Sequence, residues 1–202
     1  MEVRAPLRAA KSDIDRFIAG KDDWIRRKLA DSIEQKARRE EFSLNYGSPV
    51  LYRAKQYPIT ARDGARAGFD GASFFMPPGL SPAKIKAVCI QIYRRLAKRY
   101  LTAKTLEYAK AMSVEPSGIR INGANMRWGS CSARKYINYS WRLILAADYV
   151  IDYVIVHELT HLKEMNHSRR FWEEVSNIMP DYQGRRHKLK ELQRRLSSED
   201  WR

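Results

Sequence analysis

The chain has 202 residues, 44% of them hydrophobic, and five Trp, which excludes a disordered chain and allows one or two domains with a sizeable core. Lysine and arginine number 38 against 23 acidic residues, so the formal net charge is +15. Such a charge attracts nucleic acid, nucleotides or acidic proteins, although solvated basic helix faces produce the same composition.

The two cysteines and the absence of long apolar runs indicate the compartment. Cys89 and Cys131 form no metal-type Cys-x-x-Cys pair, and two thiols so far apart fit a reducing compartment better than a disulfide framework. No signal peptide opens the sequence, and no apolar run reaches transmembrane length. We therefore expect a cytoplasmic protein with no membrane partner.

Residues 1–80 are expected to form a first region of helices followed by a small β unit. Apolar positions at helical spacing predict the helices, and β-favourable runs between turn-rich segments predict the strands. The predicted elements are, in order, a short strand over residues 2–6, helices over 12–19 and 22–39, and strands over 42–44, 50–56 and 72–76.

Residues 81–202 are expected to form a second, larger domain. Ser81 as N-cap and Pro82 at the first helical position predict a long helix to Met112, with an apolar stripe on one side and lysines and arginines on the other. That basic face suits either solvent or phosphate groups. The elements predicted after it are strands over 118–122 and 135–141, extended chain over 141–145, a helix over 148–165 capped by Asp148, and helices over 168–179 and 182–197.

Three of the four histidines lie in the segment from Val156 to His167. On a helix, His157 and His161 project from one face because they are four residues apart, and both can bind one ion. Glu158, beside the first histidine, is placed to act on a metal-bound water rather than on the metal. The alternative is a buried helix whose histidines only satisfy hydrogen bonds in the core.

The third histidine requires a reversal of the chain. If the helix continued, His167 would lie about 15 Å along the axis from His157, too far to share an ion. A common site therefore needs the helix to stop near Met165 and the chain to fold back. Asn166 suits that break because asparagine tolerates left-handed backbone angles.

Three neutral imidazoles and one water would make an open tetrahedral Zn²⁺ site of the kind that catalytic zinc uses. Zinc lowers the pKa of its bound water to about 7. Glu158 can then take a proton from the water and pass it to the leaving group. Cys131 as a fourth ligand would close the site and abolish catalysis.

Further polar residues near the motif have candidate roles. The candidates for contacting the oxyanion or the substrate are Arg127, Tyr139 and Arg142. The candidates for steadying the ligand histidines are Glu164 and Asn166. Trp128 is expected in the core, and His187, alone on a charged helix, is expected to have no role.

The run Arg127-Trp128-Gly129-Ser130-Cys131, the strand ending at Tyr139–Leu143, and the histidine motif followed by Phe171-Trp172 together resemble the bacterial YgjP-like zinc metallopeptidase family. The resemblance spans about residues 45–195. It implies an α+β, zincin-like core in which a small mixed β-sheet lies beside the zinc-binding helix, with C-terminal helices. It also implies an edge strand near Tyr139 that aligns an extended peptide by strand addition. The roles it implies are His157, His161 and His167 as zinc ligands and Glu158 as the catalytic glutamate.

The leading hypothesis is therefore a zinc-dependent metallopeptidase acting on a peptide or protein. Two alternatives stay open. Some members of the family are described as metal-dependent nucleoside-triphosphate pyrophosphatases, and the charge of +15 suits a phosphate substrate, although no Gly-rich phosphate loop occurs. The Arg-Trp-Gly-Ser-Cys run is also similar to SprT-like proteases, which act near DNA, and this leaves a nucleic-acid-associated protein open.

Overall fold

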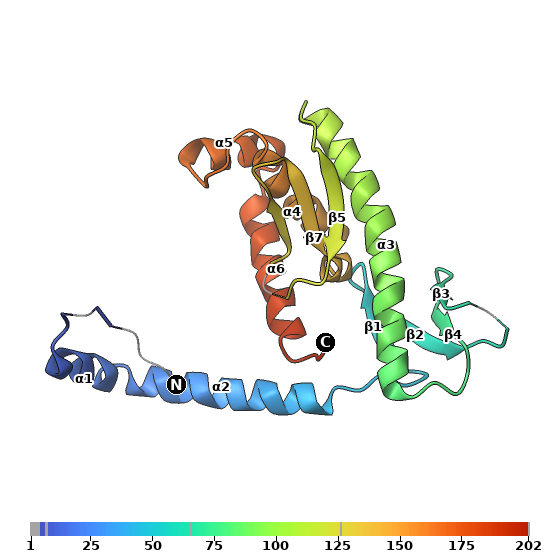
Figure 1. Ribbon diagram of the computed structural model, residues 1–202, viewed down its shortest axis with the longest axis horizontal. Helices are drawn as coiled ribbons and strands as arrows, with labels where there is room; N and C mark the ends of the chain where they lie inside the picture. Colours follow the sequence, from blue (N-terminus) through green and yellow to red (C-terminus); the bar gives the residue numbers. More distant parts are fainter. Residues whose placement is uncertain (1–4, 7, 65, 126, 202) are drawn as a thin grey trace. The chain divides into compact units, whose positions relative to one another are not determined.

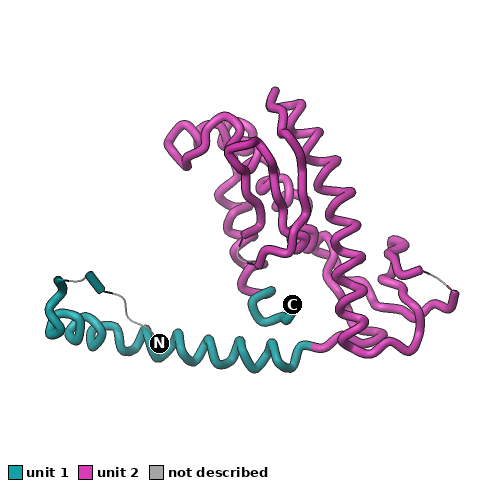
Figure 2. Tube along the Cα trace, in the orientation of Figure 1, with its two compact units in different colours: residues 1–42, 196–200, 202 teal, residues 43–195, 201 magenta. Residues whose placement is uncertain are grey.

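The computed structural model describes residues 5–6, 8–64, 66–125 and 127–201, and it has a mixed α+β fold (Figure 1). Two compact units are present: the described residues up to 42 together with 196–200, and residues 43–195 together with Trp201 (Figure 2). The division falls between Phe42 and Ser43, whereas the sequence suggested a domain boundary near residue 80. The small β unit therefore shares a compact unit with the histidine motif.

The first unit contains α1 (Lys11–Ala19) and α2 (Asp22–Glu41), as predicted, and neither helix has a buried residue. Large apolar side chains on these helices are exposed, including Phe17 and Ile33 at 68% and 70%. The strand predicted over residues 2–6 lies mostly outside the described residues.

The second unit begins with a sheet of short strands, in the order β1-β2-β4-β3. Its bounds are β1 Pro49–Tyr52, β2 Lys55–Ala61, β3 Gly68–Phe69 and β4 Phe74–Met76. The single strand predicted over 50–56 is wrong, because a two-residue turn at Arg53 and Ala54 divides it. Both turn residues have positive φ, at 48° and 61°, as tight hairpin turns require. The sequence carries no glycine or asparagine to signal this turn. Residues 42–44 form no strand.

The long helix α3 (Pro82–Ala111) begins with Ser81 as N-cap and a proline in its first turn, as predicted. It packs against β4, β5 and the helix α4 that carries the histidine motif. Its buried face includes Tyr93, whose ring stacks on Trp141 at 5.3 Å between centroids and whose hydroxyl donates a hydrogen bond to the Leu51 carbonyl at 2.7 Å. This helix therefore joins the small sheet to the rest of the unit.

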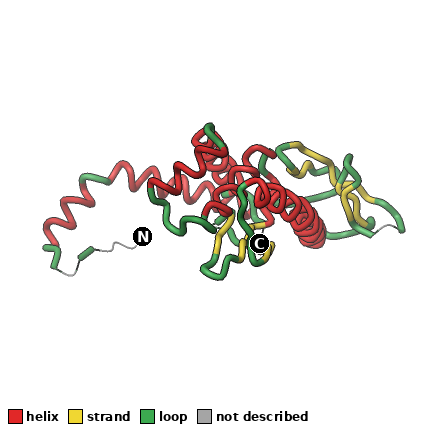
Figure 3. Tube along the Cα trace, turned by 90° about the horizontal axis from the view of Figure 1, so that it is seen from above, coloured by secondary structure: helices red, strands yellow, loops and turns green. Residues whose placement is uncertain are grey.

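The second sheet contains β5 (Gly118–Asn122), β6 (Gly129–Cys131) and β7 (Tyr136–Ser140) in the order β5-β7-β6. It is mixed, because β7 runs parallel to β5 and antiparallel to β6. The two sheets are the separate yellow groups of Figure 3. Tyr139 itself lies on the central strand, and the edge strand beside it is β6, whose Gly129 pairs with Tyr139. The edges of this sheet are β5 and β6.

Residues Trp141–Leu145 form a 3-10 helix, η1, rather than the extended chain that we predicted. Ser140 precedes it and accepts a hydrogen bond from the Arg142 backbone N–H. Four of its five residues are buried, and a short buried apolar run has the same composition in a strand as in a helical turn.

Three helices complete the chain: α4 (Asp148–Thr160), α5 (Arg169–Ile178) and α6 (Tyr182–Leu196). Ala147, not Asp148, is the N-cap of α4. Val150 and Val154, which lie on the same side of α4 as His157, are buried. None of the described helices combines the length and the apolar composition needed to cross a membrane.

Candidate metal centre

The histidine motif lies where α4 ends and the chain reverses. The helix ends at Thr160, five residues earlier than predicted. The hydroxyl of Thr160 donates a hydrogen bond to the Val156 carbonyl at 2.8 Å. His161 still has helical backbone angles, so its ring lies on the same side as that of His157. Asn166 does not have the left-handed backbone predicted for it. Because α4 ends at Thr160 and α5 begins at Arg169, the residues between them reverse the direction of the chain.

The reversal brings the three histidine rings together. One ring nitrogen from each of His157, His161 and His167 lies within 4.8 Å of the others. The Nε2 atoms of His157 and His167 are 3.1 Å apart. Two nitrogens bound to one tetrahedral zinc at about 2.0–2.1 Å would be roughly 3.3 Å apart, so the cluster has nearly the required spacing.

The hydrogen bonds of the cluster also suit a metal. His161 donates from Nδ1 to the backbone carbonyl of Glu164 at 3.1 Å, which orients the ring and leaves Nε2 for an ion. Glu164 thus steadies a histidine, as expected, but through its backbone rather than its carboxylate. The Nδ1 atom of His157 is buried and has no hydrogen-bond partner within the described part of the chain.

Burial favours the neutral forms of His157 and His161. Burial, together with the neighbouring His161 and His167, lowers the pKa of His157 to about 3. Burial also lowers the pKa of His161. Because a histidine must be unprotonated to bind a metal, the buried rings are in the form that an ion requires.

Glu158 lies between the histidine cluster and strand β6. Its side chain is buried at 5% exposure, and a Cβ placed on Gly129 would lie only 2.6 Å from its Oε1. Its Oε2 is buried with no hydrogen-bond partner among the residues that are described. Burial raises the pKa of Glu158 to about 8, and the positive charge of Arg127 acts in the opposite direction. Such a carboxyl group can gain and lose a proton near neutral pH.

Two of the predicted substrate contacts, Tyr139 and Arg142, have partners within the protein. Tyr139 is fully buried, with its hydroxyl 3.2 Å from that of Thr105. Arg142 donates from its guanidinium to the backbone carbonyls of Gly123 and Trp201, both at 3.0 Å. The prediction for Tyr139 is wrong, because strand alternation turns its side chain into the core. The prediction for Arg142, which is half-buried, stays a prediction.

The other candidates are distributed around the site. Arg127 is exposed and acts electrostatically on Glu158, so its role stays a prediction. Trp128 is half-buried. Cys131 lies on β6 but is not part of the metal-binding cluster found among the described residues. His187 is exposed and lies 3.2 Å from Glu191 on α6, which is compatible with its having no role at the centre.

Aromatic residues of α5 and α6 surround the cluster, a role that the sequence did not predict. The ring of Phe171 lies 4.6–4.9 Å from all three histidine rings. Trp172 stacks on His167 and on Tyr182, and Arg186 lies 5.5 Å over the Trp172 ring. The signal in the sequence is that Phe171 and Trp172 lie four and five residues after the third histidine, on a helix capped by Ser168.

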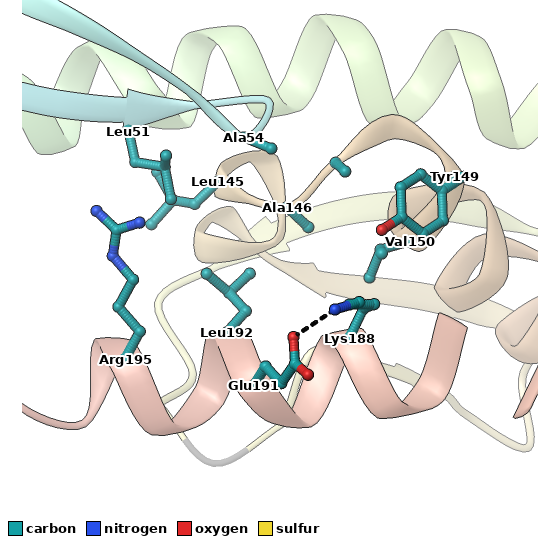
Figure 4. Close-up of a pocket in the computed structure, with 11 residues that line it drawn as sticks. Leu51, Ala54, Leu145, Ala146, Tyr149, Val150, Lys188, Glu191, Leu192 and Arg195 are labelled. Atoms are coloured by element: carbon teal, nitrogen blue, oxygen red, sulfur yellow. Dashed lines mark hydrogen bonds and ion pairs between the residues drawn. The ribbon is translucent and has the colours of Figure 1, made fainter. Parts of the chain in front are cut away.

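A separate hollow of about 250 Å³ lies between the β1–β2 turn, η1 and α6 (Figure 4). Its lining is mainly apolar, with the ion pair between Lys188 and Glu191 at one side. Tyr149 and Val150, which line it, lie in the first turn of α4, at the other end of that helix from His157 and His161. The hollow is therefore distinct from the histidine cluster.

A family model described as "YgjP-like, metallopeptidase domain" matches residues 1–192. A search of the curated proteins gives no match. The metallopeptidase zymogen of Pyrococcus abyssi abylysin aligns with a TM-score of 0.42 and 19% identity over 49% of this chain and 97% of its own. The metallopeptidase zymogen of Methanocaldococcus jannaschii jannalysin aligns with a TM-score of 0.41 and 20% identity over 45% of this chain and 94% of its own.

Proposed function

Because the chain belongs to the YgjP-like metallopeptidase domain family, we propose that it hydrolyses peptide bonds with one zinc ion held by His157, His161 and His167. The observation that supports this most strongly is the convergence of three ring nitrogens from two segments, within 4.8 Å of one another. Imidazole nitrogens suit zinc, and three of them leave a coordination position for catalysis.

Glu158 is the proposed general base and acid. When bound, zinc supplies Lewis-acid chemistry that makes water more acidic and polarises the scissile carbonyl. Glu158 accepts the proton of the attacking water at Oε2, the buried oxygen that has no partner among the described residues. It then delivers that proton to the amide nitrogen that leaves. Burial raises the pKa of Glu158, which favours the protonated form that the side chain adopts between the two transfers.

The substrate is proposed to bind along β6. This strand pairs with β7 on one side, and no strand of the described chain pairs with its other side. An extended peptide can add to such an edge through backbone hydrogen bonds. Because Gly129 of β6 lies against Glu158, a peptide on this edge would place its backbone beside the carboxylate.

The test is hydrolysis of a mixed peptide library by zinc-loaded protein, comparing wild type with Glu158→Gln. We expect the variant to lose activity by about 10²- to 10⁴-fold, the usual contribution of a general acid–base residue, without loss of zinc. Glu164→Gln is the matched control, because its backbone carbonyl rather than its carboxylate contacts His161. Full activity in Glu158→Gln would contradict the proposal. If the protein hydrolysed nucleoside triphosphates but not peptides, the proposed peptide substrate would be wrong.

A further inference from the structure

Arg186 is a cation of α6 that lies beside the histidine cluster and takes no part in the chemistry proposed above. Its guanidinium lies 5.5 Å from the centre of the Trp172 ring, and the same indole stacks on His167. Tyr182, one helical turn before Arg186, also stacks on Trp172. A single aromatic ring therefore lies between this guanidinium and a residue of the cluster.

The positive charge of Arg186 acts on residues of α4. Burial is the largest cause of the lowered pKa of His157, the two neighbouring histidines follow, and Arg186 acts in the same direction. Arg186 also opposes the rise in pKa that burial causes in Tyr153, whose ring lies 5.9 Å from that of His157. The guanidinium is thus close enough to the cluster to influence a charged group bound there.

Arg186 is exposed, and no acidic side chain in the ranges that the structure describes forms an ion pair with it. The carboxylates on and just before α6 contact other cations: Asp181 accepts from Arg185, and Glu191 accepts from Lys188. The contact with Trp172 is a cation–π contact, which leaves the N–H donors of a guanidinium available for an anion.

The donors of Arg186 suit one carboxylate. A guanidinium is a planar fork that binds a carboxylate through two parallel hydrogen bonds. The adjacent cation, Arg185, donates to Asp181 and to the Tyr149 carbonyl, so it does not add a second guanidinium to the same place. One isolated guanidinium matches a single carboxylate better than a series of phosphates.

We propose that Arg186 determines substrate specificity by binding a carboxylate of the peptide, within about three residues of the bond that is cleaved, at about 3.3 Å per residue of extended chain. The carboxylate is that of an Asp or Glu side chain or that of the peptide's own carboxyl terminus. This inference rests on the proposed function, because it needs a peptide bound at the histidine cluster. The net charge of +15 favours the encounter with an acidic peptide but does not select the position of the carboxylate.

The test is a mixed peptide library cleaved by the zinc-loaded full chain, with the cleaved bonds identified by mass spectrometry. In the wild type, Asp, Glu or a free carboxyl terminus should be enriched within three residues of the cleaved bonds. Arg186→Gln should reduce this enrichment by about 5- to 10-fold, as expected for a charge-assisted hydrogen bond at a partly exposed site. Arg186→Lys should retain part of it, because the charge remains but the fork is lost.

The matched control is Lys188→Gln, which removes one positive charge from the same helix. Lys188 pairs with Glu191 beside the separate hollow (Figure 4), so its charge does not face the cluster. This variant should keep the wild-type enrichment. Unchanged enrichment in Arg186→Gln, or an equal loss in Lys188→Gln, would overturn the proposal.

The same library with amidated carboxyl termini distinguishes the two sources of the carboxylate. Enrichment that persists in the amidated library assigns the contact to Asp and Glu side chains. Enrichment that disappears assigns it to the terminal carboxylate.

A binding measurement separates a failure of this proposal from a failure of the proposed function. Fluorescence anisotropy follows the binding of a labelled alanine–glycine peptide that contains Glu and a free carboxyl terminus to zinc-loaded Glu158→Gln. Adding Arg186→Gln should weaken this binding by about 5-fold, and a peptide with Gln and an amidated terminus should bind equally to both proteins. Equal binding of the Glu peptide to both would overturn the role of Arg186, whether or not the wild type hydrolyses peptides.

Discussion

Phe171 packs against the rings of all three histidines that we propose as ligands. It is fully buried and comes from α5, the helix that begins just after the reversal. A rigid apolar ring between His157, His161 and His167 limits the rotation of each imidazole. It also keeps water from the back of the cluster, so it should set the affinity for the ion without binding it.

Replacing this ring should therefore loosen the metal. We predict that Phe171→Leu lowers zinc affinity by about 10- to 100-fold, the range found when residues that support metal ligands are changed. Competition with a chelator of known zinc affinity measures this. Phe69→Leu, in the aromatic cluster of the small sheet, is the control and should leave zinc affinity unchanged. Equal zinc affinity in Phe171→Leu and the wild type would refute this role.

At the scale of single residues, the sequence predicted what depends on local spacing. His157 and His161 lie on one side of a helix because of their separation in the chain, and this needs no knowledge of the fold. The role of Phe171 depends on how α5 returns to α4, which no local pattern reports. For the same reason, the sequence could not show that Tyr139 points into the core.

The contact between β6 and α4 is close because Gly129 has no side chain. A Cβ at this position would lie 2.6 Å from Oε1 and 2.7 Å from Cγ of Glu158. One of the two elements must move if the methyl group is added, and Glu158 is the nearest group that can move.

We predict that Gly129→Ala lowers peptide hydrolysis by more than 10-fold, because a small displacement of a catalytic group is costly. Zinc content should stay at the wild-type level, since the histidines are not displaced. Gly184→Ala on α6 is the control, because a Cβ there meets nothing within 4 Å. Wild-type hydrolysis by Gly129→Ala would show that catalysis does not depend on the position of the Glu158 carboxylate beside Gly129.

The β1–β2 turn is held to the start of α4 by an ion pair. Arg53 donates from Nε to Asp148 Oδ1 at 2.6 Å, and this hydrogen bond holds the pKa of Asp148 below its ordinary value. Because the pKa of Asp148 is lower in the folded than in the unfolded state, the ion pair stabilises the fold at pH values above the unfolded-state pKa. That stability is lost as the pH falls through the folded-state pKa.

Asp148→Asn should accordingly be less stable than the wild type at pH 7 but not at a pH well below 4. The two side chains are 37% and 47% exposed, so the difference should be less than about 1 kcal/mol. Urea unfolding at a series of pH values measures it. Arg53→Gln should remove the same pH-dependent component, and a difference between Asp148→Asn and wild type that is constant with pH would contradict this explanation.

At the scale of elements, the sequence predicted the helices better than their ends and better than the short strands. The start of α3 was clear because Ser81 and Pro82 form a strong local signal. The end of α4 was placed too late because residues 161–165 have no residue type that forces a helix to stop. The hairpin at Arg53 was missed because its turn is supported by distant groups, the carbonyls of Ile144 and Leu145, to which the turn donates its backbone N–H groups.

In the whole molecule, the buried hydrophobic residues of the described chain lie in the second unit, with the exception of Leu196. The described residues up to 42 include none that is buried, whereas the core residues from Leu44 to Val175 belong to the second unit. The sequence pattern could not show this division, because apolar residues at helical spacing predict a helix but not whether its apolar side is buried.

Deleting residues 1–42 should therefore leave the second unit folded. We predict cooperative unfolding and a melting temperature changed by less than the roughly 2–4 °C that 1 kcal/mol produces in a domain of this size. Calorimetry of the shortened chain measures this. A broad transition, or loss of the zinc that the full chain binds, would show that the N-terminal helices support the core.

The central claim is that three imidazoles hold one metal ion, and the most direct measurement is zinc content and affinity in single-histidine variants. We predict one zinc per chain in the wild type, loss of zinc in His161→Ala, and a large fall in affinity in His167→Ala. His187→Ala, at a histidine on α6 outside the cluster, should bind zinc as the wild type does. Wild-type zinc affinity in His167→Ala would contradict the claim, because the residue brought back by the chain reversal would then contribute nothing to the site.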